Sequence, residues 1–147
     1  MTATINKLEQ LLTSGSAYLA IAPESELVQK PAPEKWSKKE IIGHLIDSGI
    51  NNLQRFTEIQ FANKPYTVRK YKQDELVKAN DYQHADTKEI VVLWLSINNR
   101  IKSLIGQQTN DTLHYNIEYN KDTIADLRFL MNDYVDHLEH HLDQIMK

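Results

Sequence analysis

The sequence contains no cysteine, which excludes disulfides, thiolate nucleophiles of the protein, iron–sulfur clusters and zinc sites built on Cys. Any soft metal ligand must therefore come from histidine, of which there are six. Chemistry on a thiol would need a thiol from outside the chain.

Long apolar runs are also missing, since the longest is Ile90–Leu95. A membrane-spanning helix needs about 18 or more consecutive apolar residues, and the first residues form no charged and apolar signal region. We therefore expect a cytoplasmic protein without a membrane partner.

Charge of one sign is absent as well, because 17 Lys and Arg stand against 20 Asp and Glu, for a net charge of -3. Such a balance provides no field that would hold a phosphate backbone, so we expect no nucleic-acid partner. With only 4 Gly and 4 Pro and 41% hydrophobic residues, the composition is that of an ordinary globular protein. Its length predicts a single domain over residues 1–147.

Apolar residues recur at intervals of three and four in four segments, which is the pattern of amphipathic helices. The first runs from Thr4 to Ala22, and the second from a capping box at Ser37-Lys38-Lys39-Glu40 to about Phe61. The third follows a cap at Asp86 and stops before Gly106, and the fourth begins at a cap on Asp122 or Thr123. The sequence predicts an all-α four-helix bundle.

The connections between these helices differ in length. Residues 62–85 form a long polar link in which Gln73 to Ala79 could make a short helix. A link of this length can cross the bundle, so the second and third helices need not be antiparallel neighbours. The loop over residues 107–121 alternates Leu113, Tyr115, Ile117 and Tyr119, which could form a short extended segment.

Three of the six histidines fall within five residues of the fourth helix. At about 100° per residue, His141 lies about 40° from the centre of the apolar face, His137 about 80° and His140 about 140°. Only His137 and His141 can therefore lean inward, and their spacing of four allows them to share one metal ion. His44, on the flank of the second helix, is the best third ligand, because His84 and His114 fall in predicted loops.

A histidine at the flank of a helix more often packs or satisfies the helix dipole than binds a metal, so a structural role is the alternative at this point. Other metal chemistries lack their motifs, since the chain has neither Glu-x-x-His nor His-Glu-x-x-His. Core packing or loop anchoring is the default role of the two tryptophans and seven tyrosines, with stacking on a substrate as the alternative.

Two stretches resemble the signatures of the DinB-like metalloprotein superfamily, which includes the bacillithiol transferases. Residues 35–47, Lys-Trp-Ser-Lys-Lys-Glu-Ile-Ile-Gly-His-Leu-Ile-Asp, are similar to W-S-x-x-E-x-x-x-H-L-x-D, and residues 137–145, His-Leu-Glu-His-His-Leu-Asp-Gln-Ile, are similar to H-x-x-H-H-x-x-Q-I. Together the two motifs cover less than a third of the chain, and the middle of the chain carries no motif of the family.

The resemblance implies a four-helix bundle with a long crossover after the second helix, and often a homodimer. It also implies one divalent metal, such as nickel, zinc or manganese, held by His44, His137 and His141, the same three that the helical angles select. Family members with understood chemistry join low-molecular-weight thiols to electrophiles or act as hydrolases.

Our leading functional hypothesis is therefore a metal-dependent thiol S-transferase or hydrolase acting on a small molecule. Asp47 or Asp136 could orient a ligand imidazole or act as a base, and Arg55 could anchor a substrate carboxylate, with Ser48 and Asn51 on the same flank of the helix. The alternative is a non-catalytic, stress-related helical dimer that binds the metal without turnover. Residues 66–82 and 113–119 are expected to shape the substrate pocket.

Overall fold

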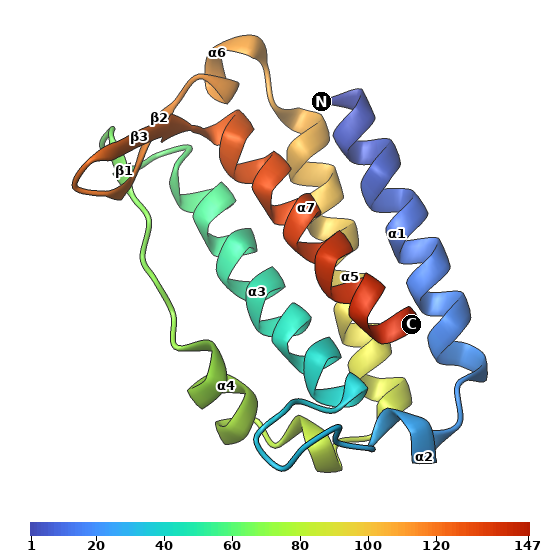
Figure 1. Ribbon diagram of the computed structural model, residues 1–147. Coiled ribbons are helices and arrows are strands. Elements are labelled where there is room, and N and C mark those ends of the chain that lie inside the picture. Colours follow the sequence, from blue (N-terminus) through green and yellow to red (C-terminus); the bar gives the residue numbers. More distant parts are fainter.

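Four long helices make up the bundle in the computed structural model, which describes all residues 1–147 (Figure 1). They are α1 (Thr2–Ile21), α3 (Lys38–Glu58), α5 (Thr87–Gln107) and α7 (Leu127–Met146). Each long helix packs against two others: α3 against α5 and α7, and α1 against the same two helices. The predicted four-helix bundle is confirmed. None of its helices is long and apolar enough to cross a membrane.

The long crossover between α3 and α5 sets the topology. After α3 ends near the small sheet, residues 59–86 run back along the bundle to its other end, so that α5 starts beside the start of α3 and runs parallel to it (Figure 1). The short helix α4 (Gln73–Ala79) and the 3-10 turn η1 (Tyr82–His84) lie in this crossover. The predicted short helix is therefore confirmed at Gln73–Ala79.

A three-stranded sheet covers one end of the bundle. Its strands are β1 (Tyr66–Thr67), β2 (Asn116–Asn120) and β3 (Thr123–Asp126), in the order β1-β2-β3. β1 pairs parallel to β2, and β2 pairs antiparallel to β3. Ile117 of β2 is fully buried, which ties the sheet to the core. The short extended segment expected in residues 107–121 is thus β2, preceded by the single-turn helix α6 (Asn110–Leu113).

Helix boundaries correct three details of the sequence analysis. α7 begins at Leu127, with the Asp126 side chain accepting from Phe129 N, and not at Asp122 or Thr123, whose neighbour Ile124 is an exposed strand residue. α5 continues through Gly106, since a helix tolerates glycine near its end. α3 ends at Glu58, before Phe61. The four-residue helix α2 (Glu24–Leu27), in the spacer after α1, was not expected.

The capping box at the start of α3 forms as predicted. The Ser37 hydroxyl accepts a hydrogen bond from Glu40 N at 3.1 Å, and the Glu40 carboxylate accepts one from Ser37 N at 2.9 Å. The box is buried, and the Ser37 hydroxyl also donates to Gln83 Oε1 at 2.6 Å. This bond ties the start of α3 to the crossover and fixes the position of the first two turns of the helix.

Candidate metal centre

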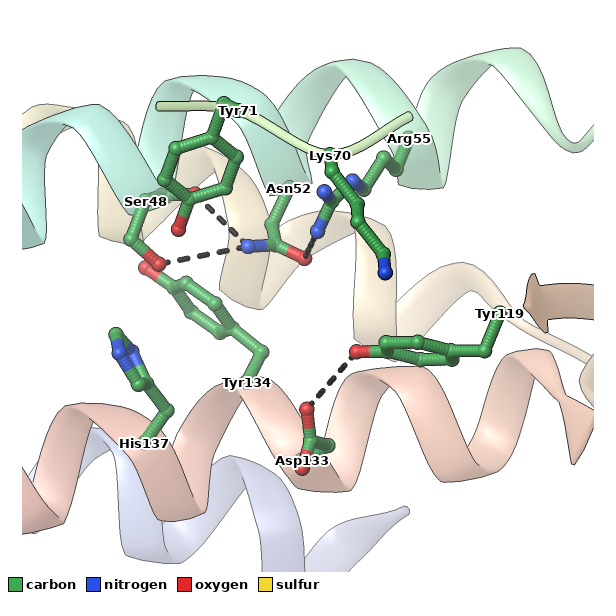
Figure 2. Close-up of a pocket in the computed structure, with 9 residues that line it drawn as sticks. All are labelled: Ser48, Asn52, Arg55, Lys70, Tyr71, Tyr119, Asp133, Tyr134 and His137. Carbon is green, nitrogen blue, oxygen red and sulfur yellow. Dashed lines mark hydrogen bonds between the residues drawn. The ribbon is translucent and has the colours of Figure 1, made fainter. Parts of the chain in front are cut away.

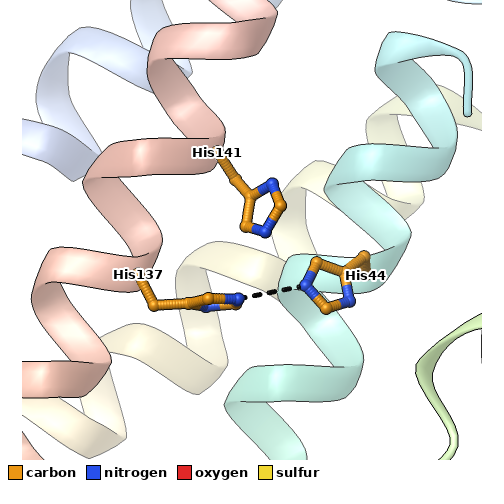
Figure 3. Close-up of side chains that lie close together, drawn as sticks. All are labelled: His44, His137 and His141. Carbon is orange, nitrogen blue, oxygen red and sulfur yellow. Dashed lines mark hydrogen bonds between the residues drawn. The ribbon is translucent and has the colours of Figure 1, made fainter.

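The side chains of His44, His137 and His141 point toward one another across the interface between α3 and α7 (Figure 3). One ring nitrogen from each of them lies within 4.8 Å of the others, and His44 Nε2 is 3.2 Å from His137 Nε2. The Ser37 cap places His44 in the second turn of α3. His137 and His141 lie one turn apart on α7, and their rings meet edge to face, with centroids 4.6 Å apart and planes inclined by 77°.

Burial keeps these imidazoles neutral. Desolvation, followed by the neighbouring imidazoles, lowers the pKa of His44 from 6.5 to about 3. The same causes lower the pKa of His137 to about 4, and desolvation also lowers that of His141. At neutral pH the three rings therefore carry no charge, which is the form of histidine that binds a metal ion.

Neighbouring side chains orient two of the rings. The Oε1 atom of Gln144 can only accept, so its contact of 2.9 Å with His141 Nδ1 places the proton there and leaves the Nε2 lone pair of His141 free. The ring of Trp36 stacks against His44, with centroids 4.9 Å apart and planes inclined by 32°. His44 Nδ1 is buried and has no hydrogen-bond partner.

The cluster fits a divalent metal ion. Two nitrogens bound at about 2.0–2.1 Å to a tetrahedral ion lie about 3.3 Å apart, close to the 3.2 Å between the Nε2 atoms of His44 and His137. Three neutral imidazoles on two packed helices are also the donor set of catalytic zinc sites, which keep a position open for a reactant.

A cavity of about 280 Å³ adjoins the cluster on the side of His137 (Figure 2). Residues of α3, the crossover, β2 and α7 line it. They are Ser48, Asn52, Arg55, Lys70, Tyr71, Tyr119, Asp133, Tyr134 and His137. Because His137 belongs both to this wall and to the histidine cluster, a molecule in the cavity lies beside the candidate metal centre.

Two of the five further site residues expected from the sequence, Ser48 and Arg55, line this cavity. Asn51 does not; its amide donates to Asp47 O at 2.8 Å, and its side chain faces the crossover at Arg69 and Tyr71.

The two aspartates expected near the metal are placed elsewhere. Asp47 Oδ1 accepts from Tyr82 at 2.6 Å and from Asn80 at 3.1 Å, so this carboxylate holds the crossover onto α3. Burial raises its pKa. Asp136 pairs with Lys7 of α1 at 2.8 Å on the exposed side of α7. The structure does not bring Asp136 to the histidines.

Several residues of the site escaped the sequence analysis. Asn52 lies one position from the expected Asn51. Asp133 lies about one turn before His137 on α7, so helical spacing from His137 could have indicated it. Trp36 and Gln144 lie inside the two motifs, but Trp36 was expected only to pack and Gln144 received no role. Lys70, Tyr71 and Tyr119 lie within residues 66–82 and 113–119, the two segments expected to shape the pocket, although no periodic pattern singles these three residues out.

The other three histidines lie outside the cluster. His140 is exposed and contacts the side-chain amide of Gln144 at 3.3 Å. His84 pairs with Asp81 at 2.7 Å, and His114 contacts Asn110 O at 2.6 Å, both at the surface. The helical angles therefore separated His140 from its neighbours correctly.

The fold and the cluster define a helical-bundle protein with three converging histidines. A sequence profile of the DinB superfamily matches residues 7–145, and the chain belongs to this family. No curated protein matches the sequence significantly.

Two of the solved structures that resemble the chain are informative here. YfiT from Bacillus subtilis, described as "a probable metal-dependent hydrolase with an unusual four-helix bundle topology", is 22% identical; the match has a TM-score of 0.85 and covers 99% of this chain and 83% of YfiT. The mycothiol-dependent maleylpyruvate isomerase is 12% identical, with a TM-score of 0.72 and coverage of 96% of this chain and 58% of the isomerase. At these identities the likeness shows a shared fold.

Proposed function

We propose that this protein is a metal-dependent enzyme that joins a low-molecular-weight thiol to a small electrophile or hydrolyses a small substrate. The observation that carries the proposal is the convergence of His44, His137 and His141 within 4.8 Å beside a cavity of about 280 Å³. A bound divalent ion would lower the pKa of a thiol or water and so supply a nucleophile at neutral pH.

The protein groups divide the remaining tasks. The three imidazoles hold the ion, and Gln144 and Trp36 hold the rings of His141 and His44. Asp133 is the only carboxylate that lines the cavity, which makes it our choice for the group that accepts the proton of the nucleophile. With no cysteine in the chain, the thiol of a transfer reaction comes from a second substrate.

Two structures of similar fold support a metal-dependent enzyme, but they do not decide between thiol transfer and hydrolysis. YfiT is described as a probable metal-dependent hydrolase, and the isomerase depends on the thiol mycothiol. The isomerase acts on the small molecule maleylpyruvate, in keeping with a cavity of this size. The homodimer and the cytoplasmic location expected from the sequence stay predictions.

The test is a metal analysis of the purified protein followed by two assays with and without added nickel, zinc or manganese. In the first, a small thiol displaces chloride from 1-chloro-2,4-dinitrobenzene, forming a thioether and releasing chloride and a proton. In the second, water cleaves 4-nitrophenyl acetate. We expect metal-dependent turnover in one assay, lost in His141→Ala and retained in the control His140→Ala.

Two outcomes would contradict the proposal. If reconstituted protein binds no metal, the histidines have a structural role. If it binds metal at the three histidines but turns over no thiol or ester substrate, the non-catalytic metal-binding module is the better description.

A further inference from the structure

Arg55 is a buried cation without an anionic partner. Its side chain is only 9% exposed, yet none of the ion pairs of the protein includes it. Arginine is seldom buried so far without a carboxylate, because removing an unpaired charge from water is costly.

Neutral groups surround the guanidinium. Nη1 donates to Asn52 Oδ1 at 3.4 Å, Nη2 donates to the carbonyl oxygen of Arg69, and the ring of Tyr71 lies 5.4 Å from the guanidinium carbon. These contacts fix the orientation of the side chain and use two of its five N–H donors. A rigid guanidinium with free donors on the wall of a cavity is suited to a planar oxyanion.

The charge of the cavity fits a monoanion. Arg55 and Lys70 contribute two positive charges to its wall, and Asp133 contributes the only negative charge. Asp133 already accepts from the Tyr119 hydroxyl at 3.1 Å. The remaining excess of one positive charge matches a carboxylate better than a doubly charged phosphate.

The cavity also has two different ends. Arg55 and Lys70 lie toward one end, and His137 lies at the other (Figure 2). The wall along α3 is lined by Ser48, Asn52 and Arg55, and the seven steps from Ser48 to Arg55 span about 10 Å of helix. An elongated molecule can therefore bind at Arg55 with one end and reach the histidines with the other.

We propose that this cavity binds the carboxylate of a small substrate at Arg55 and directs the other end of that molecule to the histidine cluster. The second half of this assignment rests on the proposed function, whereas the carboxylate site at Arg55 does not. The substrate class is a small monocarboxylic acid that carries an electrophilic group at the end away from its carboxylate.

The test compares benzoate with its neutral analogue benzamide, titrated into the protein by calorimetry and by amide-resolved NMR. We expect benzoate to bind more tightly than benzamide and to shift the signals of Asn52, Arg55 and Tyr119. Arg55→Gln should lower the affinity for benzoate about tenfold or more, because hydrogen bonds to charged groups contribute about 1.5–3 kcal/mol. Arg69→Gln removes a neighbouring charge outside the cavity and should leave the affinity unchanged.

Further variants separate this inference from the metal centre. His141→Ala should still bind benzoate, since Arg55 remains. Lys70→Ala alters an exposed side chain and should weaken the binding of benzoate about threefold at low salt without changing the binding of benzamide. This variant tests the proposal even if Arg55→Gln does not fold. The proposal would be overturned if the protein bound benzoate and benzamide with equal affinity. It would also be overturned if His141→Ala lost benzoate binding while Arg55→Gln bound benzoate as the wild type does.

Discussion

His44 and His137 stand 93 residues apart in the sequence, yet their Nε2 atoms lie 3.2 Å apart between α3 and α7. Two imidazolium ions could not approach so closely in a buried site, because their charges would repel. Burial lowers the pKa of both rings, so the pair is neutral at neutral pH, and the packing of α3 against α7 brings the two rings together.

The cap of α3 contributes to both stability and site geometry. Ser37→Ala removes the acceptor for Glu40 N and the donor to Gln83. We expect the free energy of unfolding to fall by about 0.5–2 kcal/mol, measured by denaturant titration followed by circular dichroism. An unchanged midpoint would mean that the box does not hold the helix start.

Gly43 lies against the ring of Tyr82, so no side chain fits there. A Cβ atom at this position would come within 2.0 Å of the ring, whereas a Cβ at Gly106 meets nothing closer than 3.8 Å. Gly43→Ala should therefore destabilise the protein by about 1–3 kcal/mol. The matched control Gly106→Ala should stabilise it slightly, by up to about 1 kcal/mol, because alanine favours helix. Equal thermal melts of the two variants would contradict this packing.

Gln144 orients His141 through the 2.9 Å contact to its Nδ1 atom. Gln144→Ala should therefore weaken metal binding by about 10- to 100-fold while leaving the fold intact, since loss of a partner that orients a ligand has effects of this size. Competition with a chromogenic chelator measures the affinity. The control is Asp143→Ala, on an exposed neighbour, which should bind as the wild type does.

Acid should destabilise the metal-free protein before its carboxylates titrate. The pKa of His44 is about 3 and that of His137 about 4, against 6.5 in the unfolded chain. Below pH 6.5 the unfolded state thus binds protons that the folded state does not, and stability falls with pH by up to about 1.4 kcal/mol per pH unit for each buried histidine.

Urea titrations between pH 7 and 5 measure this slope. Asp47, whose pKa is raised by burial, acts in the opposite sense, so the comparison of wild type with His44→Ala isolates the histidine. We expect a smaller slope in that variant. An equal slope would show that His44 is not held neutral.

Local signals predicted the helices well and their exact starts less well. The capping box at Ser37 involves only neighbouring residues, so the sequence predicted it correctly. The predicted start of α7 was wrong because both Asp122 and Asp126 can cap a helix. The pairing of residues 123–126 with β2 leaves Asp126 as the cap. That pairing depends on the position of β2 after the bundle has formed.

At the site too, features set by neighbouring residues were predictable, whereas features set by tertiary packing were not. Helical angles selected His137 and His141 over His140, and the structure places the selected pair with His44. Asn52 lines the cavity, whereas Asn51 faces the crossover segment at Tyr71, and periodicity along α3 contains no information on where that segment lies. The pairing of Asp136 with Lys7 likewise depends on how α1 packs against α7.

The central claim is that three particular histidines hold one divalent ion. The most direct measurement is a set of thermal melts with and without nickel, zinc or manganese for wild type and for His44→Ala, His137→Ala, His141→Ala and His140→Ala. A metal that binds only the folded state adds about 2.7 kcal/mol at a hundredfold excess over Kd, so the melting temperature of the wild type and of His140→Ala should rise with metal. The three cluster variants should not respond. An equal response in wild type and His141→Ala, or a loss of response in His140→Ala alone, would contradict the account.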